Sequence, residues 1–220
     1  MTDMLSIFGI THRFGTKLVL NNVNFEMRIG DIIGIFGRNG SGKSTLLNLL
    51  FGTLRRQGGT ININNHKIAP VELRKHIAYS TQNIFLPASL TVRNIIPLYF
   101  PESDDQNKIF YSEGIHKIEK YKVGRLSIGE QKYLQFLLTV HLPQQFILLD
   151  EPFAMIDPLY QDIIRNKILE LSEVKGFILT DHYYKQVFDI ANKCFLMKEG
   201  ILNPITSIKD LKDGGYISGG

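Results

Sequence analysis

Residues 37–45, Gly-Arg-Asn-Gly-Ser-Gly-Lys-Ser-Thr, form a glycine-rich segment between an apolar run and a leucine-rich run. The spacing is Gly37-x4-Gly42-Lys43-Ser44, which is typical of a loop joining a buried strand to the start of a helix. Glycine has no Cβ atom, so consecutive backbone N–H groups can turn toward one anion. The dipole of the following helix adds positive potential at the same place. The segment therefore predicts a strand–loop–helix unit that holds a polyphosphate, and hence a nucleoside triphosphate.

The side chains at the end of this segment have the chemistry that phosphate binding needs. The Lys43 ammonium would reach the β- and γ-phosphates, and the Ser44 hydroxyl is an oxygen ligand for Mg²⁺. A glycine turn with an exposed lysine is the alternative, but the flanking strand and helix disfavour it. The residues expected to contact the nucleotide are Gly37, Arg38, Asn39, Gly40, Ser41, Gly42, Lys43, Ser44 and Thr45.

The charge of the chain does not indicate a nucleic-acid partner. The net charge is +4 and the pI is about 9.0, but the basic residues are dispersed. The densest cluster contains Lys117, Lys120, Lys122 and Arg125, and Glu119 interrupts it. Such a cluster is more often a solvated surface than a binding face. We therefore expect no nucleic acid among the partners.

Composition also bears on the compartment. A chain of 220 residues with 44% hydrophobic and 21% charged residues is typical of a globular protein with a real core. The single cysteine, Cys194, excludes an internal disulfide and fits a reducing compartment, most simply as a core residue. We expect no secretory signal at Met1-Thr2-Asp3, and the apolar stretch from Phe136 to Leu142 is too short to cross a bilayer. Any membrane role is therefore expected to come through a partner.

Predicted strands alternate with predicted helices along most of the chain. This alternation predicts an α/β fold with a mostly parallel sheet flanked by helices. The glycine-rich loop at 37–45 makes the expected fold one of the P-loop NTPase type. The first strands are joined by short turns and predict an antiparallel β subdomain near the N-terminus. We expect strands at 5–10, 18–29, 31–36, 60–63, 77–80, 146–149, 176–180 and 193–197, and helices at 43–51, 71–76, 127–141, 159–171 and 184–191.

The whole chain is expected to form one domain that carries a short helical insert. The divisions are a nucleotide-binding core at 1–84 and 126–206, the insert at 85–125 and a loose, glycine-rich tail at 207–220.

Prolines and polar residues define what we expect inside the insert. A helix that begins at Thr91 is expected to break at Pro97 and Pro101. The following residues, 102–108, are polar and are expected to be mobile. A second helical pattern ends near Val123.

A second motif supplies the carboxylates that phosphate chemistry needs. The aliphatic run 146–149 is followed directly by Asp150 and Glu151. Parallel strands that are buried on both faces read as continuous aliphatic runs, and ligands lie beyond their carboxyl ends. Asp150 would hold Mg²⁺, and Glu151 would polarise a water molecule against the γ-phosphate. A solvated acidic turn is the alternative, which the phosphate loop disfavours.

These motifs, with further segments in the same order and spacing, resemble the nucleotide-binding domain of ABC-type ATPases over nearly the whole chain. The resemblance implies ATP and Mg²⁺ as cofactors and ATP hydrolysis as the activity. Gln82 matches the glutamine that senses Mg²⁺ and the attacking water, and His182 matches the switch histidine that contacts the γ-phosphate. Phe14 lies where the family places an aromatic ring against adenine, although a plain core role stays open. The implied catalytic residues are Glu151, His182 and Gln82, and the implied metal ligands are Ser44, Gln82 and Asp150.

The family's signature sequence, Leu-Ser-Gly-Gly-Gln, corresponds to Leu-Ser-Ile-Gly-Glu at 126–130. The resemblance implies that this segment faces ATP held by a second copy of the chain, or by a paralogous nucleotide-binding domain, in a head-to-tail dimer. Ile128 adds bulk there, and the Glu130 carboxylate would repel phosphate if it pointed inward. We expect a working but weakened closed state, and a regulatory module with slow turnover is an alternative. The residues implied to act across the dimer are Ser127, Gly129, Glu130 and Asp157.

The resemblance implies the ATP-hydrolysing subunit of a membrane transporter, peripheral on the cytoplasmic face. A membrane-spanning subunit would dock near residues 83–101, where apolar side chains are frequent. An equally weighted interpretation is that these side chains form the insert's own small core. A family member that acts on nucleic acid or ribosomes is a further alternative, but those proteins usually carry a coiled-coil insert or two nucleotide domains. The cargo and the direction of transport stay open.

Overall fold

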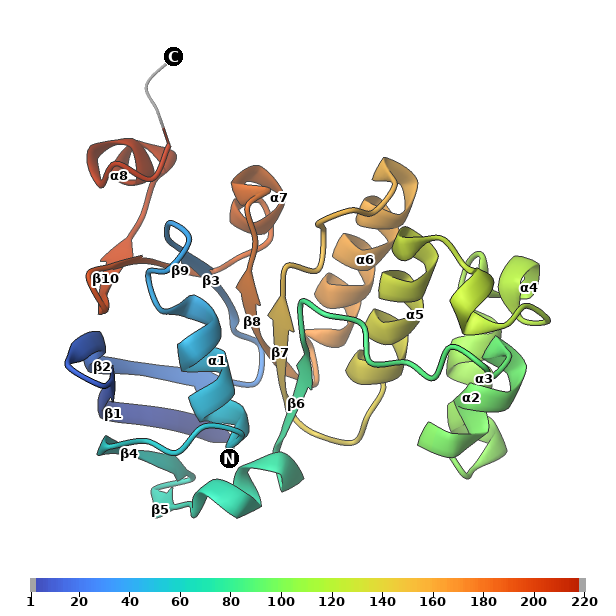
Figure 1. The fold of residues 1–220 in the computed structure, drawn as a ribbon, viewed down its shortest axis with the longest axis horizontal. Helices are drawn as coiled ribbons and strands as arrows, with labels where there is room; N and C mark the ends of the chain where they lie inside the picture. The colour runs from blue at the N-terminus through green and yellow to red at the C-terminus, as the bar shows by residue number, and fades with distance from the viewer. Residues whose placement is uncertain (1–2, 218–220) are drawn as a thin grey trace.

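The computed structural model describes residues 3–217, and within this range the strands form two sheets (Figure 1). The smaller sheet is antiparallel and has the order β2-β1-β4-β5, which confirms the predicted N-terminal subdomain. Strand β1 runs longer than the predicted 5–10 because it pairs with β2 from Met4 to Phe14, and β4 begins two residues before the predicted 60–63; β2 lies within one residue of the predicted 18–29. Their bounds are β1 Met4–Phe14, β2 Lys17–Arg28, β4 Gly58–Ile63 and β5 His66–Lys67.

The larger sheet has the order β10-β9-β3-β8-β7-β6 and is parallel except for the β9–β10 pair. This confirms the predicted, mostly parallel sheet. The order places β8 between β3 and β7, so the ends of these three strands meet at one edge. The strand bounds are β3 Ile32–Phe36, β6 Ile77–Ser80, β7 Phe146–Asp150, β8 Gly176–Thr180, β9 Lys193–Lys198 and β10 Ile201–Ile205.

The aliphatic strands supply two hydrophobic cores, one on each face of the large sheet. In β7, Phe146 and Leu148 join one core, whereas Ile147 and Leu149 join the other, as the alternation of a strand requires. The first core contains the leucines of α1 (Lys43–Phe51), which lies between the two sheets (Figure 1). The second core packs against α5 (Ile128–Val140), α6 (Pro158–Leu171) and α7 (Tyr184–Phe188). Helix α7 ends at Phe188 and not at Ala191 as predicted.

The insert is more regular than the sequence predicts. Its helices are α2 (Val92–Tyr99), α3 (Ser103–Phe110) and α4 (Ile115–Ile118), followed by a 3₁₀ turn at Val123–Arg125. Outside the insert, the helix predicted at 71–76 is a 3₁₀ turn at Pro70–Lys75. The predicted break at Pro97 is wrong, since Pro97 lies inside α2 on its exposed face. The predicted mobile segment 102–108 is also wrong. It lies mostly in α3, where Asp104 and Asp105 complement the helix dipole and Ile109 packs into the core.

The described part of the C-terminal segment, residues 207–217, is ordered, which contradicts the predicted loose tail. Helix α8 (Ile208–Asp213) begins at Ser207 with a capping box to Asp210, and Leu211 is fully buried. Residues 218–220, which the same prediction covers, lie outside the described residues. Cys194 is buried, as predicted. Among the described residues, no helix has both the length and the apolarity that a bilayer crossing requires.

His141, the C-cap residue that directly follows α5, should make folding sensitive to acid. Burial, followed by the nearby Lys167 and Lys108, lowers its pKa from 6.5 to about 4. Below pH 6.5 the unfolded chain therefore binds a proton that the folded chain does not, so stability falls as the pH falls from 6.5 toward 4. We expect the free energy of unfolding, measured with urea, to fall between pH 7 and pH 4.5 in both the unmodified protein and His141→Gln. The fall should be about 2–3 kcal/mol larger in the unmodified protein. Exposed His116→Gln is the control, and equal losses in all three proteins would contradict this assignment.

Candidate nucleotide-binding and hydrolysis site

The phosphate loop has the predicted strand–loop–helix geometry. Strand β3 is buried throughout and ends at Phe36, and α1 begins at Lys43. Gly42 has a φ of 111°, and a Cβ atom there would lie 2.9 Å from both Val19 O and Leu20 Cδ2. A Cβ atom on Gly37 would lie 2.6 Å from Ser41 Oγ. These two glycines are therefore required by the close approach of neighbouring chain segments as well as by the ligand.

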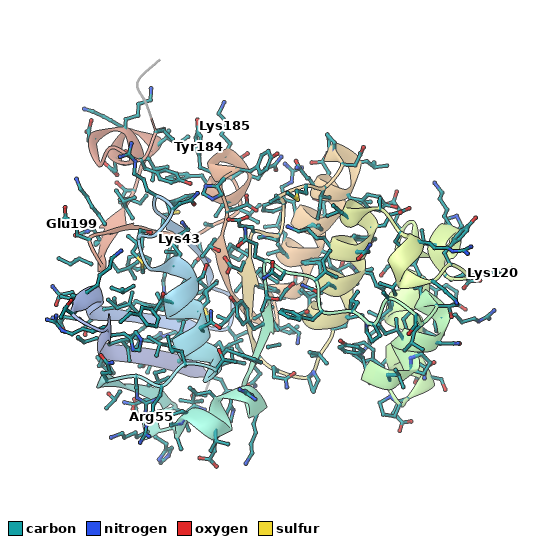
Figure 2. All side chains as sticks on the ribbon, viewed as in Figure 1. Lys43, Arg55, Lys120, Tyr184, Lys185 and Glu199 are labelled. Carbon is teal, nitrogen blue, oxygen red and sulfur yellow. The ribbon has the colours of Figure 1, made fainter. Side chains whose placement is uncertain are left out.

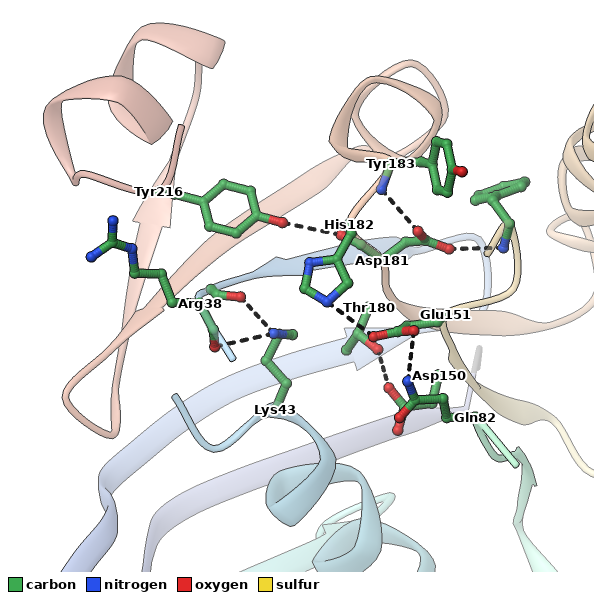
Figure 3. A network of polar contacts seen from close by, with 12 residues as sticks. Arg38, Lys43, Gln82, Asp150, Glu151, Thr180, Asp181, His182, Tyr183 and Tyr216 are labelled. Atoms are coloured by element: carbon green, nitrogen blue, oxygen red, sulfur yellow. Dashed lines mark hydrogen bonds and ion pairs between the residues drawn. The ribbon is translucent and has the colours of Figure 1, made fainter. Parts of the chain in front are cut away.

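Lys43 lies inside the curve of this loop. Its Nζ donates to the carbonyl oxygens of Gly37 at 2.5 Å and Arg38 at 3.4 Å (Figure 3), and Figure 2 shows it at the start of α1. Burial lowers the pKa of Lys43, while Asp150 and Glu151 act in the opposite direction. An ammonium held where a polyphosphate would lie is the positive charge that such a ligand needs.

Asp150 ends β7 and is almost fully buried. Its two carboxylate oxygens accept hydrogen bonds from the hydroxyls of Thr180, at 2.5 Å, and Tyr79, at 3.1 Å (Figure 3 shows the Thr180 bond). Thr180 ends β8 and Tyr79 is the penultimate residue of β6, and these two strands flank β7, so the pairing of the sheet holds the carboxylate in place. Burial, with the charge and hydrogen bond of Asp150, raises the pKa of Tyr79 well above its usual range, so this hydroxyl stays a donor.

Glu151 turns away from the direction of the strand because its backbone has a φ of 57°, in the left-handed region. Its carboxylate accepts a hydrogen bond from Gln82 Nε2 at 2.8 Å, and His182 Nε2 lies 3.1 Å from its other oxygen (Figure 3). The three residues lie in the loops that directly follow β6, β7 and β8. The structure therefore brings the three predicted catalytic residues into one group, in the arrangement that a base and its two orienting neighbours require.

This group and the phosphate loop line one cavity of about 490 Å³. Arg38 and Gly37 lie outside its lining, and Arg38 lines a neighbouring cavity of about 600 Å³. Phe14 also lies outside both linings. It is 53% exposed on β1 and its ring makes a T-shaped contact with that of His12, so adenine stacking stays a prediction. The lining residues are Val19, Asn39, Gly40, Ser41, Gly42, Lys43, Ser44, Thr45, Gln82, Glu151 and His182.

The signature segment caps α5 at a place outside this cavity lining. The Ser127 hydroxyl accepts from the Glu130 backbone N–H at 3.2 Å, and the Glu130 carboxylate accepts from the N–H and hydroxyl of Ser127. The Glu130 side chain therefore caps the N-terminus of its own helix, α5. Ile128 keeps ordinary helical backbone and is 54% exposed, so its bulk faces solvent in the single chain.

The remaining residue predicted to act across a dimer, Asp157, lies near the signature segment. It caps α6 by accepting the Leu159 N–H at 2.9 Å. A Cβ atom on Gly129 would lie 3.2 Å from Met155 O and 3.9 Å from Asp157 N, so glycine permits the close approach of these two segments. The four predicted residues therefore form a second cluster, separate from the phosphate-loop cavity of the same chain.

Sequence reasoning missed several residues that shape the site. Tyr79 and Thr180 hold Asp150, and Val19 lines the nucleotide cavity. The signal for the first two was available, since Thr180 is the last residue of a predicted strand and Tyr79 the last but one of another. Their partner depended on the strand order, which the sequence did not supply. Tyr216, whose hydroxyl donates to the backbone carbonyl of Asp181, the residue before His182, was hidden in a segment predicted to be loose.

The fold and the site together define a P-loop ATPase. The family model for ABC transporters (ABC_tran) matches residues 20–154, more than half of the chain. The protein therefore belongs to the ABC transporter family, as an ATP-binding subunit with ATPase activity. This confirms the resemblance seen in the sequence.

Relatives and solved structures agree with this assignment. The lipopolysaccharide export system ATP-binding protein LptB of Acidithiobacillus ferridurans is 26% identical over 97% of this chain and 94% of its own. The methionine import ATP-binding protein MetN of Chlamydia felis is 26% identical over 94% of this chain and 70% of its own. A structure of an ATP-binding subunit of an ABC transporter has a TM-score of 0.84 at 19% identity, covering 99% of this chain and 95% of its own. Likeness at that identity shows the fold alone.

Proposed function

We propose that this chain powers a transporter from the cytoplasmic face of the membrane by closing on a second copy of itself, or on a paralogous domain, when ATP binds. The observation that carries the proposal is the division of the site into two clusters. Gln82, Glu151 and His182 line the phosphate-loop cavity, whereas the signature segment and Asp157 lie outside that lining. A head-to-tail pair would bring one cluster to the other's γ-phosphate, so ATP would favour the closed pair.

A magnesium ion bound with ATP fits the oxygen donors at the base of the cavity. Ser44 lies in the first turn of α1 and in the cavity lining, and Asp150 is fixed nearby by its two hydroxyl partners. The Gln82 amide nitrogen donates to Glu151, so its oxygen is the atom suited to the metal. The described residues contain no cluster of three or more acidic, histidine or cysteine ligands. That suits Mg²⁺, which keeps several waters and phosphate oxygens and would offset charge on the β- and γ-phosphates.

Some apolar side chains of segment 83–101 are buried, as the core interpretation predicts, and others are exposed, as the docking interpretation predicts. Ile95, Ile96 and Phe100 are buried in the core of the domain, whereas Phe85 and Leu98 are 73% and 68% exposed. The exposed part adjoins an apolar cavity of about 380 Å³, which Phe85 helps to line. We propose that a membrane-spanning subunit docks there.

Such docking would be transmitted to the catalytic group through the backbone after Gln82. The Gln135 side chain donates to Thr81 O at 3.0 Å and accepts from Phe85 N–H at 3.1 Å. Gln82 lies between these two anchors, so movement of Phe85 would move the glutamine that contacts Glu151.

The test is a mild-detergent purification of tagged chain from its own host, in a Glu151→Gln background with Mg-ATP. We expect a multi-helix membrane protein in comparable amount, and Phe85→Ser should reduce its recovery by at least about tenfold, as for a central aromatic contact. Tyr111→Ser, which removes an 84% exposed tyrosine elsewhere on the insert, is the control and should retain the partner. Recovery of a dimer with no membrane protein, or of one bound to ribosomes or nucleic acid, would contradict the transporter proposal.

A further inference from the structure

The C-terminal segment 207–217 packs against the edge of the large sheet where the catalytic group lies. After α8 the chain turns back, and the Tyr216 N–H donates to Leu211 O at 2.8 Å. Leu211 belongs to the core on that face of the sheet. The turn and the buried leucine together fix the backbone at Tyr216, whose side chain points toward Asp181 and His182 (Figure 3).

The Tyr216 ring contacts the base of the phosphate loop. Its centroid lies 6.1 Å from that of Phe36, the residue directly before Gly37. Phe36 also stacks on Phe188 of α7 at 5.7 Å. Tyr216 further lines the cavity of about 600 Å³ beside the phosphate loop. Phe36, directly before the phosphate loop, therefore contacts both the Tyr216 ring and the helix that follows His182.

The Tyr216 hydroxyl reaches the peptide that carries His182. It donates to the backbone carbonyl of Asp181 at 3.3 Å (Figure 3). The carboxylate of Asp181 accepts the backbone N–H groups of Phe153, at 2.8 Å, and Tyr183, at 2.9 Å. Asp181 is thus bound to the Glu151 loop, to its own loop and to the C-terminal segment. Burial, with the charges of Asp181 and Glu151, raises the pKa of Tyr216 to about 12, so the hydroxyl remains a donor at neutral pH.

We propose that Tyr216 is a positioning residue for hydrolysis, whose hydroxyl fixes the 181–182 peptide so that the His182 imidazole stays against Glu151. The inference rests on the proposed role of His182. Tyr216 itself touches neither Glu151 nor the phosphate-loop lysine through any hydrogen bond found among residues 3–217. Its loss should therefore reduce the rate of turnover more than the affinity for ATP.

The discriminating variant is Tyr216→Phe, which keeps the ring on Phe36 and removes the hydroxyl alone. We expect kcat to fall about 3- to 10-fold, as for the loss of one hydrogen bond, and the KM for ATP to stay within about twofold. Tyr111→Phe removes a hydroxyl from a solvent-exposed ring and should leave both constants unchanged. An unchanged kcat in Tyr216→Phe would overturn the inference.

A spectroscopic readout separates positioning from a general effect on stability. The chain has six histidines, so ¹⁵N-histidine NMR spectra are simple, and the signal missing in His182→Ala identifies His182. We expect Tyr216→Phe to shift this signal and leave those of His12, His66, His76 and His116 in place. A fall in kcat without that shift would show a merely structural role and overturn the inference. A full rate in His182→Ala would instead refute the proposed role of His182, on which the inference depends.

Discussion

Replacing Lys43 with alanine should lower the rate of ATP hydrolysis by at least about 100-fold. Its ammonium group lies within the curve of the phosphate loop, 2.5 Å from Gly37 O, at the place where phosphate charge would accumulate. Removing one charged donor from such a site typically costs 10²–10³-fold in rate. The ground state should suffer as well, since a charged hydrogen bond contributes about 1.5–3 kcal/mol. We therefore expect ATP affinity to fall about 10- to 100-fold, measured by equilibrium titration with a fluorescent ATP analogue.

A charge-matched variant shows whether this loss is local. Lys120→Ala removes an exposed lysine on the insert, far from Lys43 in Figure 2, and should change neither binding nor rate by more than about twofold. Thermal unfolding of both variants tests whether the chain stays folded, because alanine leaves the Gly37 and Arg38 carbonyls without the Lys43 partner. If folded Lys43→Ala kept more than a tenth of the rate, the assignment of the phosphate loop would fail.

Replacing Glu151 with glutamine should separate binding of ATP from its hydrolysis. Glutamine has the same shape as glutamate and can still reach Gln82 and His182. It lacks the carboxylate that would accept a proton from water. Loss of a general base typically costs 10²–10⁴-fold. We expect kcat to fall by at least about 100-fold while ATP affinity stays within about threefold. Phosphate release and equilibrium titration give the two values.

The same variant tests the proposed closed pair, since ATP that is not hydrolysed should keep two copies together. Gel filtration with saturating Mg-ATP should show a dimer that disappears with ADP. The exposed Glu173→Gln is the matched control and should turn over normally without accumulating a dimer. A Glu151→Gln protein that binds ATP tightly yet stays monomeric would refute the dimer while leaving the catalytic role of Glu151 intact.

The parts of the site that could be predicted from sequence are those with a local cause. The phosphate loop follows from glycine spacing between a strand and a helix, and Asp150 and Glu151 follow from their place at the end of an aliphatic strand. Relations between distant segments could not be derived in this way. The Tyr79 and Thr180 contacts to Asp150 depend on which strands are neighbours, and that order is set by packing of the whole sheet.

The wrong predictions have the same origin. Pro97 is a strong helix breaker by propensity, yet α2 tolerates it because it lies on the exposed face while Ile95 and Ile96 pack into the core. The tail was predicted to be loose from its glycines, whereas Leu211 and Tyr216 hold it to the sheet. In both places tertiary contacts outweigh a local preference.

The position of α1 couples the ligand to the cooperativity of folding. Its first residues belong to the phosphate loop, and its leucines share one core with Leu5 and Ile7 of the antiparallel sheet and with Ile33 and Leu148 of the parallel sheet. Helix α1 covers apolar side chains of both sheets, so detaching it from one sheet would also expose apolar surface of the other. The two sheets should therefore unfold as one unit. ATP bound at the first turn of α1 would thus protect the entire domain against denaturation, in proportion to the logarithm of its concentration.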